Sequence, residues 1–335
     1  MLQEQMTGSS ISSVQCSSSV FPEETVLRSS RNGRLHRKNG RGKFTDNCYQ
    51  KPYVLVFDGD VLPEERQGAQ KIVASTFEEV LCYIGILGET SEVYLSKDFE
   101  NSNPLLSRKV KSITYRQAEE YVQNHEVDTE LGKFINRIPL DIASLMHSPL
   151  AMKEDDAVAP VLDKRYVHKK KDANILISDY YSKGNFLYFN MYDQTREIQF
   201  DHDSDHVQGL LLLEAMRQAS IATTHISGGL PEEGTIALLT YDSGFYNFLE
   251  LTAPIVVRTY TPFSFNSADS NGDVFVSCEI FQWGKLASSA LLKGKAFPDK
   301  SRYVNYRIRT EKVQARHKKQ YDSKIMSVQN TVGVI

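Results

Sequence analysis

The stretch that decides the fold is FDHDSDHVQGLLLLEAMRQA, residues 200–219. Its first seven residues contain three aspartates and two histidines, and they lead directly into four leucines that are followed by Glu214. An ionised side chain that is buried without a partner is costly. A carboxylate at the centre of the most apolar part of the chain therefore needs a specific structural or chemical reason.

Residues 210–226 predict a helix that is buried on most sides, because its apolar residues cover most of the circumference. Gly228 and Gly229 follow and can supply a left-handed cap. Strand-like segments with Gly, Asn and Asp turns lie on both sides of this helix. The fold class predicted from this pattern is α+β, with an antiparallel sheet wrapped around one central helix. The segments are 173–181, 185–192, 235–249, 254–265, 273–284 and 285–297.

Glu214, Arg217 and Gln218 are spaced i, i+3 and i+4, so they share one face of the helix. A local ion pair would make the carboxylate tolerable, which is the structural interpretation. His202 and His206 precede the helix, and a carboxylate with a histidine can perform general acid/base chemistry. His206 and Glu214 would lie roughly 12 Å apart along a continuous helix. Either the loop folds back, or the histidine meets a glutamate of another subunit.

Four parts are expected along the chain. Residues 1–51 are Ser-rich and then basic, with seven Lys or Arg in 28–43, and predict disorder. Residues 52–150 predict a small α/β module with a strand at 53–57, a helix at 64–84, a strand at 93–99 and a helix at 113–125 that Thr114 can cap. Residues 160–300 form the sheet and helix domain. Residues 301–335 are a basic tail.

The composition and net charge of the chain exclude few classes of function. A net charge of −3 gives no reason to expect nucleic acid as the main ligand. The four cysteines form no CxxC pair, so they suggest neither a zinc site nor a disulfide framework. No apolar run approaches the roughly 18 residues of a membrane span, and the N-terminus lacks the apolar core of a signal peptide. We expect a cytoplasmic protein without metal or cofactor; a metal held by His202, Asp203 and His206 is the weaker alternative.

The segment DHVQGLLLLEAMRQA, 205–219, resembles the A-factor (gamma-butyrolactone autoregulator) biosynthesis hotdog family, within the hotdog-fold acyl-thioester proteins. The family pattern is Asp-His-Val-Pro-Gly followed by Leu-Leu-Glu-Ala-x-Arg-Gln-Ala. The segment YVHKKKDANILISDYY, 166–181, is similar to the family's Val-His-Lys opening and the strand that follows it. This resemblance covers about 165–300.

The resemblance implies a hotdog fold and an acyltransferase that joins an acyl group, carried as a thioester on acyl carrier protein or CoA, to a small hydroxylated acceptor. The setting would be autoregulator or other secondary-metabolite biosynthesis. Glu214, His206 and His202 would be catalytic, with Glu214 as general base on the acceptor. The substrate would be bound by the N–H groups of Gly209 and Leu210 and by Arg217 and Gln218.

Two features depart from the family pattern. Family members usually contain two hotdog repeats, whereas one full motif is visible here, so a homodimer or a degenerate repeat must supply the pairing. Gln208 stands where the pattern has proline, which loosens the turn that positions His206. Related dehydratases pair a glutamate aligned with Glu214 with a histidine across the dimer interface.

Other functions stay open. The domain could bind acyl chains or acyl carrier protein without catalysis, with the basic segment 307–319 contacting that acidic partner, or it could act as an acyl dehydratase or thioesterase. VLVFDGDV, 54–61, resembles the first motif of haloacid-dehalogenase-like phosphohydrolases, with Asp58 and Asp60 as its carboxylates. Asp-Gly-Asp is also an ordinary turn sequence.

Overall fold

A computed structural model describes residues 52–63, 69–124, 129–142, 145, 159–192, 195–202, 204–251, 253–265 and 272–332. Every described residue belongs to the second of two units of the chain, Tyr49–Ile335. The disorder predicted for 1–51 lies outside the described residues. No helix in the described ranges has the length and apolarity needed to cross a membrane.

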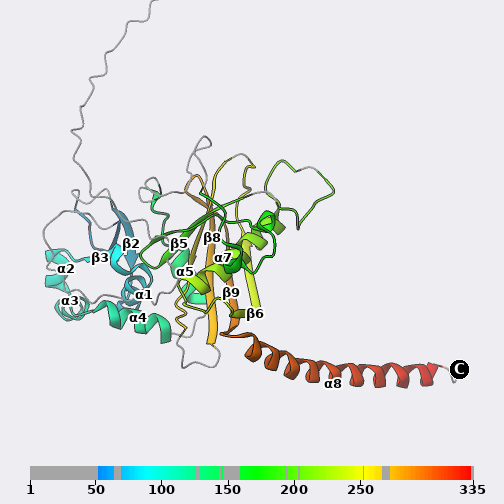
Figure 1. Cartoon of the computed structure of the whole chain (residues 1–335). Helices are drawn as coiled ribbons and strands as arrows, with labels where there is room; N and C mark the ends of the chain where they lie inside the picture. The colour runs from blue at the N-terminus through cyan, green and yellow to red at the C-terminus, as the bar shows by residue number, and fades with distance from the viewer. Residues whose placement is uncertain are drawn as a thin grey trace, which may run out of the picture. The chain divides into compact units, whose positions relative to one another are not determined.

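The first part of the second unit is a three-stranded parallel sheet with helices (Figure 1). Its central strand, YVLVF, is buried at all five positions, as expected for a strand covered on both faces. The strand order is β2-β1-β3. The elements are β1 Tyr53–Phe57, β2 Gln70–Ala74, α1 Phe77–Leu87, β3 Ser91–Tyr94, α2 Lys97–Ser102, α3 Pro104–Lys111, α4 Tyr115–Asn124 and α5 Thr129–Asn136.

The helix predicted over 64–84 is wrong in its first half. Residues 70–74 form β2, which pairs with β1, and α1 starts only at Phe77. Thr76 caps α1 by accepting a hydrogen bond from the Glu79 N–H. The strand predicted over 93–99 ends at Tyr94, because α2 begins at Lys97. The cap predicted at Thr114 is confirmed, since its hydroxyl accepts the Gln117 N–H at 3.3 Å.

A six-stranded antiparallel sheet forms the second part, in the order β4-β5-β7-β8-β9-β6. One helix, α7 Gly209–Ile226, packs against it, which confirms the predicted α+β class (Figure 1). Gly229, after the helix, has the left-handed conformation that its sequence predicts, with φ of 70°. The strands are β4 Tyr181–Lys183, β5 Phe186–Met191, β6 Thr235–Phe245, β7 Ile255–Tyr260, β8 Gly272–Gln282 and β9 Lys285–Phe297. Only the end of the predicted strand 173–181 is part of the sheet.

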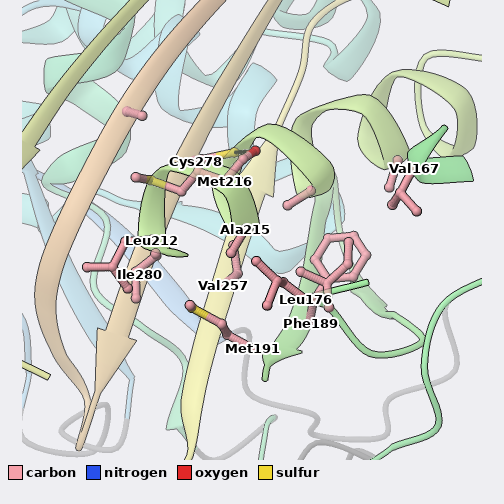
Figure 2. Packing of buried hydrophobic residues seen from close by; sticks show 14 of the residues in the cluster. Val167, Leu176, Phe189, Met191, Leu212, Ala215, Met216, Val257, Cys278 and Ile280 are labelled. Atoms are coloured by element: carbon pink, nitrogen blue, oxygen red, sulfur yellow. Dashed lines mark hydrogen bonds between the residues drawn. The ribbon is translucent and has the colours of Figure 1, made fainter. Parts of the chain in front are cut away.

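The main core lies between α7 and the sheet. Figure 2 shows Leu212 beside Ile280, Ala215 beside Val257, and Met216 near Cys278. Ala215, Met216 and Ala219 are fully buried, and small residues at such positions allow the helix to approach the strands closely. The leucine run therefore does what its sequence predicts: it forms the buried helix at the centre of the domain.

The other face of the sheet is covered by the α/β part. Arg258 of β7 is fully buried and pairs with Glu279 of β8 at 2.7 Å. Its guanidinium also donates to the carbonyls of Ile138 and Pro139, at 2.6 and 3.0 Å. One continuous apolar cluster contains residues of both parts, among them Tyr53 and Phe281. Residues 52–145 are thus packed on the sheet through a shared core.

The last element is a long helix, α8 Lys300–Val332. The sequence predicted only a basic tail there. Tyr303 and Tyr306 pack on Phe297 at the end of β9, with ring centroids 5.6 and 5.1 Å apart from that ring. From Glu311 to Gln329 every residue is exposed.

Candidate active site

A pocket of about 310 Å³ opens at the N-terminus of α7. Apolar and aromatic side chains from the helix and from the segment after β6 form most of its wall. His206 stands at its rim. The lining residues are His206, Val207, Gly209, Leu212, Phe245, Tyr246, Asn247, Phe248 and Leu249. A mostly apolar cavity with a few polar groups is typical of small-ligand sites.

Backbone pairing holds His206 in place. His206 forms a β-bridge with Glu250, and the Val207 N–H donates to the Leu249 carbonyl at 2.9 Å. The ring lies against Phe248, with centroids 4.8 Å apart, and its Nδ1 lies 2.7 Å from an Asp205 carboxylate oxygen. This hydrogen bond lowers the pKa of Asp205. In the tautomer whose Nδ1–H donates to an ionised Asp205, Nε2 is the hydrogen-bond acceptor of the ring.

The first turn of α7 supplies backbone donors beside the same pocket. Gln208, the N-cap residue, makes no side-chain capping hydrogen bond. Its carbonyl accepts the N–H groups of Leu211 and Leu212, at 2.9 and 3.3 Å. The N–H groups of Gly209 and Leu210 precede these and have no carbonyl one turn back within the helix. With the helix dipole, they can stabilise a negative oxygen.

Glu214 is held by three donor side chains on another side of the helix. Its Oε1 accepts from Lys169 Nζ at 2.7 Å, from Arg217 at 2.8 Å and from Gln218 at 2.9 Å, and its Oε2 accepts from Arg217 Nε at 2.7 Å. Burial opposes its ionisation, but these hydrogen bonds outweigh burial and lower the pKa of Glu214 to about 2. The carboxylate is thus ionised, and both of its oxygens accept hydrogen bonds from side chains. Gln218 extends the network by accepting from the Leu176 N–H at 2.8 Å.

Within one chain the structure does not bring the predicted catalytic residues together. Leu212 lines the pocket, and Glu214 lies roughly 200° further around the helix, on a different side. His202 is exposed and contacts Asp201 and Gln208, at 3.3 and 3.1 Å. Asp203, its predicted metal-binding neighbour, lies outside the described residues. In the described part of the chain, no three potential metal ligands cluster.

Asp58 and Asp60, the two carboxylates of the phosphohydrolase-like segment, lie at a turn directly after β1. Asp58 is exposed, and Gly59 has a φ of 82°. Asp60 is buried and accepts the N–H groups of Val61 and Ser96, both at 2.9 Å. Both oxygens of Asp60 therefore hold loops together.

Two contacts near the helix were missed by sequence reasoning. His168 and His225 face each other, with their Nε2 atoms 2.9 Å apart. Lys169 is the third partner of Glu214, and it also contacts Glu197. The run VHKKK gave a signal for both residues, but nothing in it distinguishes Lys169 from Lys170 and Lys171.

Comparisons with known proteins agree with this architecture. The model of the A-factor biosynthesis hotdog domain matches residues 150–298. No curated protein matches the chain.

Solved structures that are similar to part of this chain include the following three. AziG of S. sahachiroi is 10% identical, with a TM-score of 0.27, over 34% of this chain and 84% of that one. A thioesterase of Haemophilus influenzae is 12% identical, with a TM-score of 0.26, over 36% and 78%. A conserved protein of Pseudomonas aeruginosa is 11% identical, with a TM-score of 0.27, over 36% and 87%.

The family match covers the sheet, α7 and the pocket, and the predicted resemblance is confirmed. Residues 150–298 match the model of the A-factor biosynthesis hotdog domain, and the likeness to that family is limited to this part of the chain.

Proposed function

We propose that the chain binds an acyl group carried as a thioester and transfers it to a small hydroxylated acceptor. The observation that carries this proposal is the His206–Asp205 pair at the rim of an apolar pocket that also contains the N-terminus of α7. The family match supports chemistry related to A-factor biosynthesis. A butyrolactone-type autoregulator or a related secondary metabolite would be the end product.

The pocket residues divide the work. Leu212, Phe245 and Phe248 surround the acyl chain by apolar contact. His206 Nε2 takes the proton of the acceptor hydroxyl, whose oxygen attacks the thioester carbonyl. The N–H groups of Gly209 and Leu210 stabilise the resulting oxyanion. When the C–S bond breaks, the His206 proton passes to the departing thiolate, so that the products are an ester and a free thiol.

We assign Glu214 to positioning. Its ionised carboxylate fixes Lys169 and Arg217 beside the helix, with three donors on Oε1 and one on Oε2. Arg217 keeps a third of its side-chain surface exposed and could bind a phosphate or carboxylate of the acceptor. His206 then takes the general-base role that the sequence had predicted for Glu214.

We propose that two copies pair along β6. This strand is at the edge of the sheet, and Leu238 and Leu239 are 48% and 58% exposed there. Phe245 and Phe248, at the pocket mouth, are 52% and 81% exposed. An edge strand with exposed apolar side chains favours pairing with another strand. A second copy on β6 would cover the pocket mouth.

We place this activity in the cytoplasm. The described cysteines, Cys82 and Cys278, are free and buried, as in a reducing compartment. The proposed acyl transfer uses neither a metal nor an organic cofactor.

The test is turnover of the full-length protein with β-ketoacyl-CoA and a triose phosphate acceptor. Thiol release is followed by colorimetry and the ester by mass spectrometry. His206→Asn should lower turnover by about 10²–10⁴-fold, whereas His317→Asn, on exposed α8, should leave it unchanged. Ester formation that survives in His206→Asn would refute the assignment. Thiol release without ester would indicate a thioesterase, and loss of water from a hydroxyacyl thioester would indicate a dehydratase.

A second candidate is an acyl-binding domain without catalysis. The ionised, hydrogen-bonded carboxylate of Glu214 favours it, because the family's glutamate is then unable to act as a base. In that case the wild type binds acyl-CoA by calorimetry but releases no thiol with any acceptor.

A further inference from the structure

The helix α8 carries a strongly positive surface. Residues 300–332 contain nine Lys and Arg and two acidic residues, a net charge of +7 in a chain whose total is −3. Every residue from Glu311 to Gln329 is exposed. Within the described part of the chain, α8 thus carries a dense and exposed positive charge.

Three of the nine cations on α8 pair with an acidic residue, among them Arg302 with Asp299 at 3.3 Å, and six, among them Lys300 and Lys324, pair with none in the described ranges. Arg307 pairs with Glu311 at 3.7 Å, and Lys318 pairs with Asp322 at 2.6 Å. Arg309, Lys312, Arg316 and Lys319 make no ion pair with any residue in the described ranges. At 100° per residue these four lie within an arc of roughly 80°, and Arg307 and Lys318 lie on the opposite side.

Apolar side chains border this arc. Ile308 and Val313 are each 43% exposed, and they lie on its two edges. A helix with one cationic arc and flanking apolar residues is suited to a groove with an acidic rim. Helices in proteins gain most of their stability by packing an amphipathic face against a neighbour. On α8, Tyr303 and Tyr306 pack the first turns on Phe297, and the exposed turns after them pack on nothing in the described ranges.

We infer that the arc Arg309–Lys312–Arg316–Lys319 is the docking surface for an acidic protein domain that carries the acyl group as a thioester. This inference rests on the proposed function, which requires a thioester carrier. Charge complementarity identifies the partner's chemistry, because four unpaired cations spaced over about 15 Å of helix match an acidic helix or groove rim. Docking would raise the rate at which the acyl group reaches the pocket.

Other occupants fit the observations less well. A second α8 would bring a second charge of +7 against the first. A lipid bilayer requires a continuous apolar face rich in Trp, Phe or Leu, whereas α8 contains none of these three residues.

The experiment compares two thioesters with full-length protein. One is an octanoyl chain on a bacterial acyl carrier protein, and the other is octanoyl-CoA. The variant Arg316→Gln/Lys319→Gln removes one Arg and one Lys from the arc. The control Arg307→Gln/Lys318→Gln also removes one Arg and one Lys, but from the opposite side of the helix. Direct binding of fluorescently labelled carrier protein is measured by anisotropy at low and high salt.

The arc variant should raise the KM for the carrier-bound substrate about tenfold at low salt, with octanoyl-CoA turnover unchanged. The control should change neither value more than about twofold. Equal effects of the two variants would overturn the inference. So would equal carrier affinity of wild type and arc variant, or tighter wild-type binding to phosphatidylglycerol vesicles or duplex DNA than to the carrier. If no thioester is turned over, the proposed function fails, and the anisotropy arm still decides whether the arc binds the carrier.

Discussion

Replacement of Glu214 by glutamine should destabilise the folded chain. The carboxylate is 16% exposed and bound by Lys169, Arg217 and Gln218, and Lys169 is itself only 8% exposed. Glutamine retains the shape but supplies no charge. The cations of Lys169 and Arg217 would then lose their shared partner, and Lys169 would keep only Glu197.

The size of the effect follows from the pKa of Glu214, which is about 2 in the folded chain against an ordinary value of 4.5. That difference corresponds to about 3 kcal/mol of preference for the ionised carboxylate in the folded state. Glu214→Gln should therefore lower the free energy of unfolding at pH 7 by about 2–4 kcal/mol.

The lowered pKa also determines how the stabilisation by Glu214 changes with pH. Because the pKa is lower in the folded chain, the unfolded chain binds more protons as the pH falls below about 4.5. The stabilisation is complete above that value and is lost as the pH approaches 2. The difference in stability between wild type and Glu214→Gln should thus be constant from pH 6 to 8 and decrease in acid.

Urea unfolding followed by circular dichroism at several pH values measures this difference. A gap below about 1 kcal/mol at pH 7, or one that does not shrink at low pH, would refute the ionised, hydrogen-bonded carboxylate. Turnover decides the role in chemistry. A folded Glu214→Gln protein with activity within tenfold of wild type supports positioning, whereas a folded protein with activity reduced by 10³ or more restores Glu214 as general base.

Three further predictions concern the rest of the fold. Arg258→Met should lower the free energy of unfolding by about 3–5 kcal/mol, and adding Glu279→Leu should recover most of it; equal losses in both variants would contradict the buried pair. Burial lowers the pKa of His168 to about 4 and also lowers that of His225, so the melting temperature should fall as the pH decreases from 6.5 to 4, and the fall should be smaller in His168→Gln. Leu239→Lys should weaken a β6 dimer at least tenfold by light scattering, and unchanged association would exclude that edge.

The sequence was sufficient for the parts of the fold with strong local patterns. The leucine run predicted α7 because its apolar positions surround the helix, and Gly229 predicted the helix end. Spacing predicted that Arg217 and Gln218 would reach Glu214. Lys169 could not be predicted, since its contact spans 45 positions and depends on how an irregular segment crosses the helix.

For one element the predicted structure was wrong, and for another no secondary structure was predicted, both for identifiable reasons. QKIVA, 70–74, alternates exposed and buried positions on an edge strand, and its short pattern merged with the helix that follows. In 301–335 the many Lys, Arg and Gln residues have good helix propensity, but without a wide apolar stripe they resemble a solvated tail. Arg258 within PIVVRTYT carried a usable signal. A cation in the middle of an apolar strand requires a partner, and Glu279 lies opposite it in the register.

The buried Arg258 also determines how this protein can be divided. Its guanidinium lies between the rings of Phe186 and Phe281 and donates to carbonyls at 138 and 139, so the sheet and the α/β part complete each other's hydrogen bonds. A hotdog fragment cut free near residue 150 would keep the Arg258–Glu279 pair but lose the carbonyl acceptors of Arg258, and it would present a bare apolar face of the sheet to water. Such a fragment is expected to aggregate. Recombination during evolution, or truncation in the laboratory, would therefore have to move residues 52–298 as one block.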